Sequence, residues 1–273
     1  MFDPRRRSSF SSHQDLTSLG SQALLRQGRD PIRVIALLIL FLALRISSLV
    51  TLSPDAGAAT LHCGSHGHPH DGEMYNPGGT DMRGSRADVQ VLSTALCTDY
   101  PDAVSSAWAM VDKGENPNGG WAQIGYWHTE ASGYTEHFHQ SLRCPSCQIW
   151  TIAWGAPTAG NTYTYQVWRD WHDGLIHFLL DGSDMGNTSW DPLDNWSVIE
   201  GRWMGEAGYY GDDVPGTKSN PADFSSVQRR YSGSWSSVSY TGNEVDACYY
   251  HLTYPVDSTS SFNIYTDPLT HVC

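Results

Sequence analysis

Short runs of alternating apolar and polar residues follow one another along most of the chain, and clusters of Gly, Pro, Asn and Asp separate them. Alternation with a period of two is typical of strands that bury one face. Outside the N-terminal region, no segment of convincing length has the period of a helix. The predicted strands are 89–96, 105–111, 120–127, 134–141, 148–154, 162–171, 175–182, 202–210, 222–231, 234–240, 247–254 and 261–266. This spacing predicts an all-β fold, an antiparallel two-sheet sandwich or jelly roll.

The turn signals support this interpretation. Asp173-Gly174 lies between two of the predicted strands, and an Asp-Gly pair in that position is a strong signal for a tight hairpin. No internal repeat interrupts the series of strands. We therefore expect one sandwich domain over 87–273, preceded by an irregular segment rich in His and Gly over 60–86.

The first 59 residues read as a targeting segment. An apolar run over 34–44 follows Arg26, Arg29 and Arg33 and precedes a stretch of small residues that ends at Ala59. That order is typical of a secretory signal peptide, with an uncleaved signal anchor as the alternative. The segment predicts a secreted, extracellular protein with no stable membrane association after cleavage.

Composition and charge agree with a β-protein and narrow its partners. The chain holds 26 Gly, 14 Tyr, 14 Pro and 11 Trp, which suits strands and turns. Its formal net charge is -13; seven of the 16 Lys and Arg residues and four of the 29 Asp and Glu residues lie in 1–59. The remaining nine basic and 25 acidic residues leave a net charge of -16 beyond residue 59. Such a domain repels phosphate backbones, so nucleic acid is excluded as a predicted partner.

All six cysteines follow the first 59 residues, and an even number in an exported chain predicts disulfides. The preferred pairs are local: Cys63–Cys97, Cys144–Cys147 and Cys248–Cys273. Six cysteines allow 15 different sets of pairs, so the sequence alone does not fix the connectivity. Cys144 and Cys147 also have the C-x-x-C redox spacing, but no βαβ pattern surrounds them.

A group of metal-binding residue types lies in the irregular segment. Its members are His62, Cys63, His66, His68 and His70. No second cluster with zinc spacing accompanies them, so the preferred interpretation is a His-rich segment without a metal. We expect no metal and no other cofactor.

The run from Gly120 to Trp127 carries the first candidate for chemistry. Alternation places Trp121, Gln123 and Trp127 on one face, opposite the apolar face that suits the core. Gly125 leaves room beside Gln123, and glycine inside a strand often marks a close approach by backbone or ligand. An amide between two tryptophans predicts a substrate site, and a glutamine paired across strands is the alternative.

The second candidate is Glu206, which lies in a predicted strand between Gly205 and Gly208. Trp203 and Tyr209 are close in sequence, and a carboxylate partly removed from water can serve as an acid or base. The alternative is a solvated glutamate at the end of a strand. Asp212 follows in the next loop and, with Tyr209, is a further candidate for substrate binding.

Taken together, these motifs resemble the glutamic peptidases, both the eqolisin type and neprosin. "AQIGYW" resembles their first catalytic strand, "HFHQSLRCPSCQIW" resembles the aromatic strand of neprosin with its short Cys loop, and "RWMGEAGYYGDDVPG" resembles the strand and loop of the catalytic glutamate. The resemblance covers roughly 105–227. It implies a concanavalin-like β-sandwich with an active site on the concave sheet.

Carried over by residue, the resemblance implies that Gln123 and Glu206 are catalytic and meet across neighbouring strands. Neprosin uses two glutamates, whereas the first position here is Gln, as in the eqolisins. The implied function is a secreted endopeptidase that hydrolyses protein or peptide substrates in acid. Trp121, Trp127, Tyr209 and Asp212 would bind the substrate.

Two other functions remain open. A sandwich with exposed tryptophans suits a non-catalytic module that binds a polysaccharide or another surface. A glycoside hydrolase would need two carboxyl groups about 5 to 9 Å apart, for which Glu136 and Glu206 are candidates. The sequence contains neither a G-x-S-x-G motif nor an H-E-x-x-H motif.

Overall fold

A computed structural model describes the sandwich domain. The described residues are 69–76, 82–94, 96–97, 100, 103–113, 120–131, 133–144, 146–190, 200–208, 213–245, 250–254 and 260–267. The predicted signal segment 1–59 lies outside them. Among the described residues there is no helix with the length and apolar character needed to cross a membrane.

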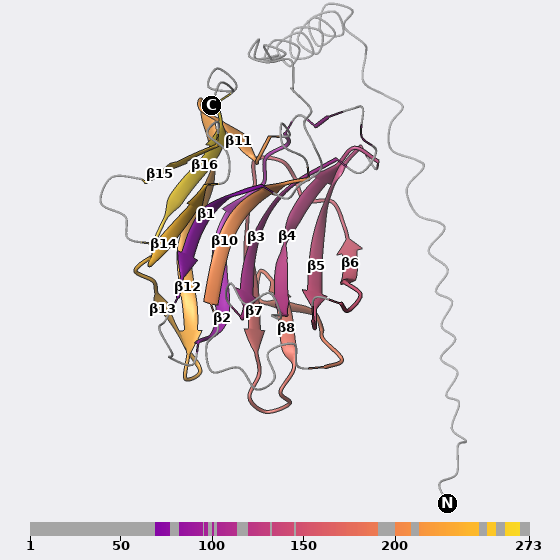
Figure 1. The fold of residues 1–273 in the computed structure, drawn as a ribbon, viewed down its shortest axis with the longest axis vertical. Coiled ribbons are helices and arrows are strands. Elements are labelled where there is room, and N and C mark those ends of the chain that lie inside the picture. Colours follow the sequence, from indigo (N-terminus) through magenta and orange to yellow (C-terminus); the bar gives the residue numbers. More distant parts are fainter. Residues whose placement is uncertain are drawn as a thin grey trace, which may run out of the picture. The chain divides into compact units, whose positions relative to one another are not determined.

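Within the described residues, the strands form two sheets that lie face to face (Figure 1). The seven-stranded sheet runs in the order β14 (Gly242–Val245), β1 (His70–Tyr75), β10 (Glu200–Ala207), β3 (Val104–Asp112), β4 (Trp121–Thr129), β5 (Thr135–Leu142) and β6 (Trp150–Trp154). The nine-stranded sheet runs in the order β15 (Tyr250–Thr253), β16 (Phe262–Thr266), β11 (Gly216–Thr217), β12 (Asn220–Tyr231), β2 (Met82–Gln90), β7 (Thr162–Arg169), β8 (Ile176–Leu180) and β9 (Ser183–Asn187), with β13 (Ser234–Ser237) paired to β12. Adjacent strands are antiparallel except for β11 and β16. The predicted all-β, two-sheet sandwich of jelly-roll type is confirmed.

The core lies between the sheets and follows the predicted alternation. Ala122, Ile124 and Tyr126 of β4 are fully buried in it, opposite residues such as Val167 and Phe178 of the second sheet. Burial of this apolar surface stabilises the sandwich. The other face of β4 is thereby left on the outer side of the seven-stranded sheet.

The prediction of an irregular segment over 60–86 is wrong where the structure describes it. Strand β1 pairs with β10 and β14, and the first residues of β2 pair with β7 and β12. The alternation was hidden because β1 turns two carboxylates inward: Asp71 is 0% exposed and Glu73 is 1% exposed. A strand is predicted from the alternation of apolar and polar residues, and β1 lacks that alternation because its inner face carries acidic residues.

The tight turn also lies elsewhere than predicted. The segment 170–175, which contains Asp173-Gly174, is a longer loop between β7 and β8. The two-residue turn is instead formed by the next Asp-Gly pair, between β8 and β9. Asp181 and Gly182 both have positive φ angles, 49° and 78°, as a turn that matches the twist of a hairpin requires.

The disulfide Cys144–Cys147 closes a short loop between β5 and β6, as predicted. Cys97 is also disulfide-bonded, and its partner lies outside the described residues. Cys63, Cys248 and Cys273 lie outside them too, so the other two pairings stay predictions. Of the five His and Cys residues considered as metal ligands in the irregular segment, only His70 is described; its Nε2 lies 3.2 Å from Oε1 of Glu244.

Candidate active site

A cavity of about 250 Å³ lies on the outer side of the seven-stranded sheet. Its lining comes from four adjacent strands, β10, β3, β4 and β5, and from nowhere else among the described residues. The lining residues are Val104, Ser106, Gln123, Trp127, Thr129, Phe138, Gln140 and Glu206. The two residues predicted to be catalytic are therefore brought into one cavity from distant parts of the chain.

The register of the strands defines how Gln123 and Glu206 are related. Glu206 on β10 faces Ser106 on β3, which faces Trp127 on β4, four positions beyond Gln123. The prediction that the two meet across neighbouring strands is wrong, because β3 lies between β10 and β4. In a regular sheet this diagonal corresponds to about 10 Å across the strands and about 13 Å along them. The two Cα atoms are therefore about 16 Å apart, with β3 between their strands.

Trp108 on β3 lies at the middle of this diagonal, because it faces Met204 on β10 and Gly125 on β4. Gly125, two positions from Gln123, has no side chain beside this indole. A Cβ at Gly125 would meet the carbonyl oxygen of Ala107 at 2.0 Å and Cα of Trp108 at 2.8 Å. Glycine is required here because the two backbones approach each other so closely.

Replacing Gly125 by alanine is expected to destabilise the domain by about 3 kcal/mol, since a methyl group cannot fit without moving a backbone strand. Chemical denaturation of the oxidised protein measures this cost. Gly242→Ala is the matched control, because a Cβ there would meet only the flexible end of Met74, at 3.3 Å. Equal effects of the two substitutions would contradict the close approach of β3 and β4.

Glu206 is half-buried, and the indole of Trp108 holds its carboxylate. Nε1 of Trp108 donates a hydrogen bond of 2.9 Å to Oε2 of Glu206. Trp108 is itself buried, with 3% of its surface exposed. A rigid donor of this kind limits the orientations of the carboxylate and directs it over the cavity.

Gln123 is buried and is oriented by a second amide. Its Nε2 donates a 2.8 Å hydrogen bond to Oε1 of Gln140, whose own Nε2 donates to Oγ1 of Thr151 at 3.1 Å. These two hydrogen bonds fix the orientation of the Gln123 amide, so that its nitrogen and not its oxygen faces Gln140. Because an amide nitrogen has two hydrogens, one N–H of Gln123 remains for a further acceptor.

Aromatic rings line the side of the cavity next to Gln123. Trp127 stacks on Phe138 with ring centroids 4.6 Å apart and an interplanar angle of 10°. Nε1 of Trp127 donates to Oε2 of Glu136 at 3.3 Å. Trp121 does not line the cavity but packs against the same apolar cluster beneath it.

An arginine network borders the site on β10. Arg202 is 11% exposed and contacts three carboxylates: Nε lies 2.7 Å from Asp112, and the other two nitrogens lie 2.9 Å from Glu244 and 3.3 Å from Glu200. Its charge is thus committed to structural ion pairs. The neighbouring His70 lowers the pKa of Glu244, chiefly through their hydrogen bond.

The pair of carboxylates considered for a glycosidase lies on strands that are three places apart in the sheet. Glu136 on β5 and Glu206 on β10 share one row across the sheet but have β4 and β3 between them. Three inter-strand spacings amount to about 14 Å between the Cα atoms. Each carboxylate is also held by a different indole. The two carboxylates are thus oriented by separate donors, Trp127 and Trp108.

Sequence reasoning did not single out Trp108, Ser106 or Gln140 for the site. Alternation on β3 and β5 places these residues on the outer face, but only the pairing of β3 with β10 and of β5 with β4 brings them to the candidate residues. Tyr209 and Asp212, the other predicted substrate-binding residues, lie outside the described residues. Their role stays a prediction.

Comparisons with known proteins identify the fold. No model of a known protein family matches the chain, and neither does a curated protein sequence. Among solved structures, scytalidoglutamic peptidase with a peptide-based transition-state analogue matches with a TM-score of 0.50 and 13% identity, over 74% of this chain and 100% of that one. The chain has the fold of a glutamic peptidase.

Two further solved structures show the range of this similarity. SCP-B, a member of the eqolisin family of peptidases in complex with the tripeptide Ala-Ile-His, matches with a TM-score of 0.49 and 12% identity, over 74% of this chain and 100% of that one. Sheep galectin-11 in complex with glycerol matches with a TM-score of 0.32 and 11% identity, over 51% of this chain and 93% of that one. At these identities the likeness concerns the sandwich alone, and function must be argued from the site.

Proposed function

We propose that this protein is a secreted glutamic endopeptidase that hydrolyses peptide bonds in acid with Glu206 and Gln123. The observation that carries the proposal is that an oriented amide and a half-buried carboxylate line one cavity of about 250 Å³. The shared fold with scytalidoglutamic peptidase supports it. The site has the parts that acyl transfer to water needs: a base, an oxyanion donor and a place for the peptide.

Glu206 acts first as the general base. It takes a proton from a water whose oxygen attacks the carbonyl carbon of the peptide, so that a C–O bond forms and the carbonyl oxygen becomes an oxyanion. Glu206, now protonated, then gives its proton to the amide nitrogen as the C–N bond breaks. The products are a carboxylic acid and an amine, and Glu206 returns to its starting state.

Gln123 stabilises the charge that develops between these steps. Its remaining N–H donates to the oxyanion, and a single donor of this kind is worth about 3 kcal/mol in the transition state. Gln140 supports this role because it accepts the other N–H and holds the amide in place. Trp108 likewise supports Glu206 by keeping one carboxylate oxygen oriented.

Secretion and action in acid have independent support. The disulfide Cys144–Cys147 is typical of proteins from oxidising compartments, and the predicted signal segment agrees with it. Protonation of carboxylates in acid reduces the strong negative charge of the domain, which lowers repulsion within it and toward acidic substrates.

A non-catalytic binding module is the second candidate, and the stacked pair of Trp127 and Phe138 favours it. An aromatic wall of this kind can stack on the apolar face of a sugar as well as on a peptide side chain. The two functions differ in what they require of Gln123. Only the peptidase needs its free N–H.

The testing experiment is digestion of a denatured, fluorescently labelled protein between about pH 3 and 5, where a general acid and base of this type operates. Wild-type protein is expected to cleave it, and Gln123→Ala is expected to lower kcat by about 10²-fold to 10³-fold. Gln140→Ala should lower kcat by less, because it removes only the hydrogen bond that orients the Gln123 amide. No cleavage by the wild type throughout this pH range would rule out the peptidase and favour the module.

A further inference from the structure

Strand β6 forms an open edge of the seven-stranded sheet. It pairs with β5 on one side, and no other described strand pairs with its second side (Figure 1). The six residues 148–153 are all exposed, and three of them are large and apolar: Ile149, Trp150 and Ile152. Every second residue of an edge strand directs its N–H and C=O groups away from the sheet. The free side of β6 can therefore accept one more strand.

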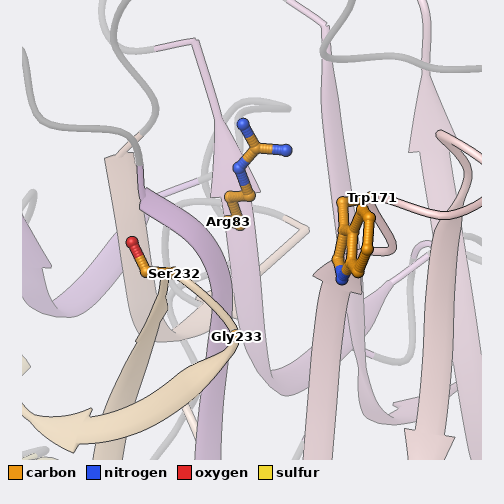
Figure 2. Close-up of a pocket in the computed structure, with 4 residues that line it drawn as sticks. All are labelled: Arg83, Trp171, Ser232 and Gly233. Carbon is orange, nitrogen blue, oxygen red and sulfur yellow. The ribbon is translucent and has the colours of Figure 1, made fainter.

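The other strongly exposed tryptophan of the described residues has a different setting. Trp171 is 66% exposed, but the ring of His172 lies tilted over it with centroids 3.7 Å apart. Figure 2 shows that Trp171 lines a hollow, of about 390 Å³, together with Arg83, Ser232 and Gly233. Polar and charged groups thus border this indole. The exposed apolar surface that lacks such groups is the one on β6.

Charge, which usually protects an edge strand, is missing from β6. The segment 144–168 contains no Asp, Glu, Lys, Arg or His, although the chain beyond residue 59 has a net charge of -16. Two other strands at the ends of the sheets do carry an acid, Glu244 on β14 and Asp184 on β9. A basic partner would find no carboxylate on β6 to bind. A second copy of this acidic chain, in contrast, can pair there without placing like charges opposite each other.

The sequence of β6 is also complementary to itself. Residues 150–154 read Trp-Thr-Ile-Ala-Trp. When two copies pair antiparallel about Ile152, each Trp150 lies opposite Trp154 of the second copy. The side chains of these three residues share one face of the sheet, because they are paired with His137, His139 and Ser141 of β5. Opposed aromatic and β-branched side chains stabilise antiparallel strands.

We propose that β6 is a dimerisation edge: two copies of the chain pair their β6 strands antiparallel around a twofold axis at Ile152. The two seven-stranded sheets then become one continuous sheet. The axis is perpendicular to that sheet, so both cavities with Gln123 and Glu206 face the same side and stay open. The interface does not depend on the proposed peptidase.

The size of this edge determines how strong the dimer can be. Strand β6 has 5 residues, few beside the roughly 20 to 30 residues that each partner contributes to a stable complex. The dimer is therefore expected to dissociate on dilution, and its Kd is expected in the micromolar range.

The first test is sedimentation velocity of the full oxidised chain from about 1 to 100 μM. The wild type is expected to pass from monomer to dimer in this range. Ile152→Lys places two ammonium groups opposite each other at the axis and is expected to weaken the dimer by about tenfold or more. Tyr231→Lys is the control, because Tyr231 is similarly exposed, 45% against 41%, but ends β12 in the other sheet. Equal unfolding midpoints of the dilute variants verify that they fold.

The second test fixes the register by cross-linking. In the proposed dimer the two copies of residue 152 are opposite each other, with Cα atoms about 4.5 to 5.5 Å apart, which suits a disulfide. Ile152→Cys is therefore expected to give a covalent dimer under mild oxidation. Gln148→Cys is the matched control on the same exposed segment. Its two copies would be eight positions apart along the joined strands, about 26 Å, and should not cross-link.

Several results would overturn the proposal. A wild type that stays monomeric over the whole concentration range excludes the dimer. A dimer that Ile152→Lys and Tyr231→Lys affect equally lies elsewhere on the domain. Cross-linking of Gln148→Cys as efficient as that of Ile152→Cys contradicts the register. A monomer with β6 amides protected from hydrogen exchange would show that another segment of the same chain covers the edge.

Discussion

The Glu206→Gln variant is expected to lose peptidase activity by about 10²-fold to 10⁴-fold in kcat, the contribution of a general acid and base. Glutamine has the shape of glutamate, and its carbonyl can still accept the hydrogen bond from Nε1 of Trp108. It cannot take a proton from water or give one to the leaving amine. Binding of a peptide in the cavity should therefore persist while turnover fails.

Steady-state kinetics on a fluorogenic peptide, together with the unfolding midpoint of the variant, measure this prediction. Glu130→Gln is the control, since Glu130 follows β4 outside the cavity and its backbone N–H bonds to the carbonyl of Ala103. A loss of kcat in Glu206→Gln alone, with KM within a few-fold, assigns the proton transfer to Glu206. Turnover of Glu206→Gln at the wild-type rate would remove Glu206 from the mechanism.

The second large effect is expected at Glu73 and concerns stability. Glu73 lies on the inner face of β1, is 1% exposed and accepts a hydrogen bond from the hydroxyl of Tyr254. Burial raises the pKa of Glu73 from 4.5 to about 7, and the bond from Tyr254 lowers it only in part. Between about pH 4.5 and 7, the folded protein therefore holds a proton on Glu73 that the unfolded chain has released.

The sign of the pH dependence follows from this difference. Stability from the protonated Glu73 is fully present below about pH 4.5 and is lost as the pH rises to about 7, where the loss reaches about 3 kcal/mol. Replacing Glu73 by the neutral glutamine should stabilise the protein by about that amount at neutral pH and change little in acid. The contribution of Glu73 alone therefore favours folding in acid.

A buried histidine works in the opposite direction and must be separated from Glu73. His139 is 1% exposed and stacks on Phe178 with centroids 4.1 Å apart. Burial lowers the pKa of His139 from 6.5 to about 4, so its contribution to stability is lost as the pH falls through that interval. Between about pH 4.5 and 6.5 the two groups oppose each other, and the wild-type curve alone reports only the sum over all titrating groups, among them His137, whose pKa burial also lowers.

Unfolding by denaturant at a series of pH values, for wild type and Glu73→Gln, isolates the contribution of Glu73 as a difference. The control Glu244→Gln should show the reverse sign, because the pKa of Glu244 is lowered by His70 and Arg202 and its charged form stabilises the folded protein. A difference between wild type and Glu73→Gln that does not change from pH 4 to pH 7.5 would show that Glu73 is not buried as described.

The sequence by itself determined the class of fold and the faces of the strands. Alternation in β4 places Ala122 and Ile124 in the core and Gln123 on the outer face, as the structure has them. It also led to the pair of residues that share the cavity, by way of the resemblance to the glutamic peptidases. A period of two is reliable because it follows from the geometry of a strand and needs no knowledge of its neighbours.

Only the tertiary structure decided which strands are neighbours and which groups meet. The order of strands places β3 between the two candidate residues and brings Trp108 to Glu206 and Gln140 to Gln123. It also includes β1, whose inward carboxylates contradict the expected pattern. The physical reason is that hydrogen bonds between strands join residues far apart in the chain, and a local pattern of polarity records whether a side chain is buried but not what it is buried against.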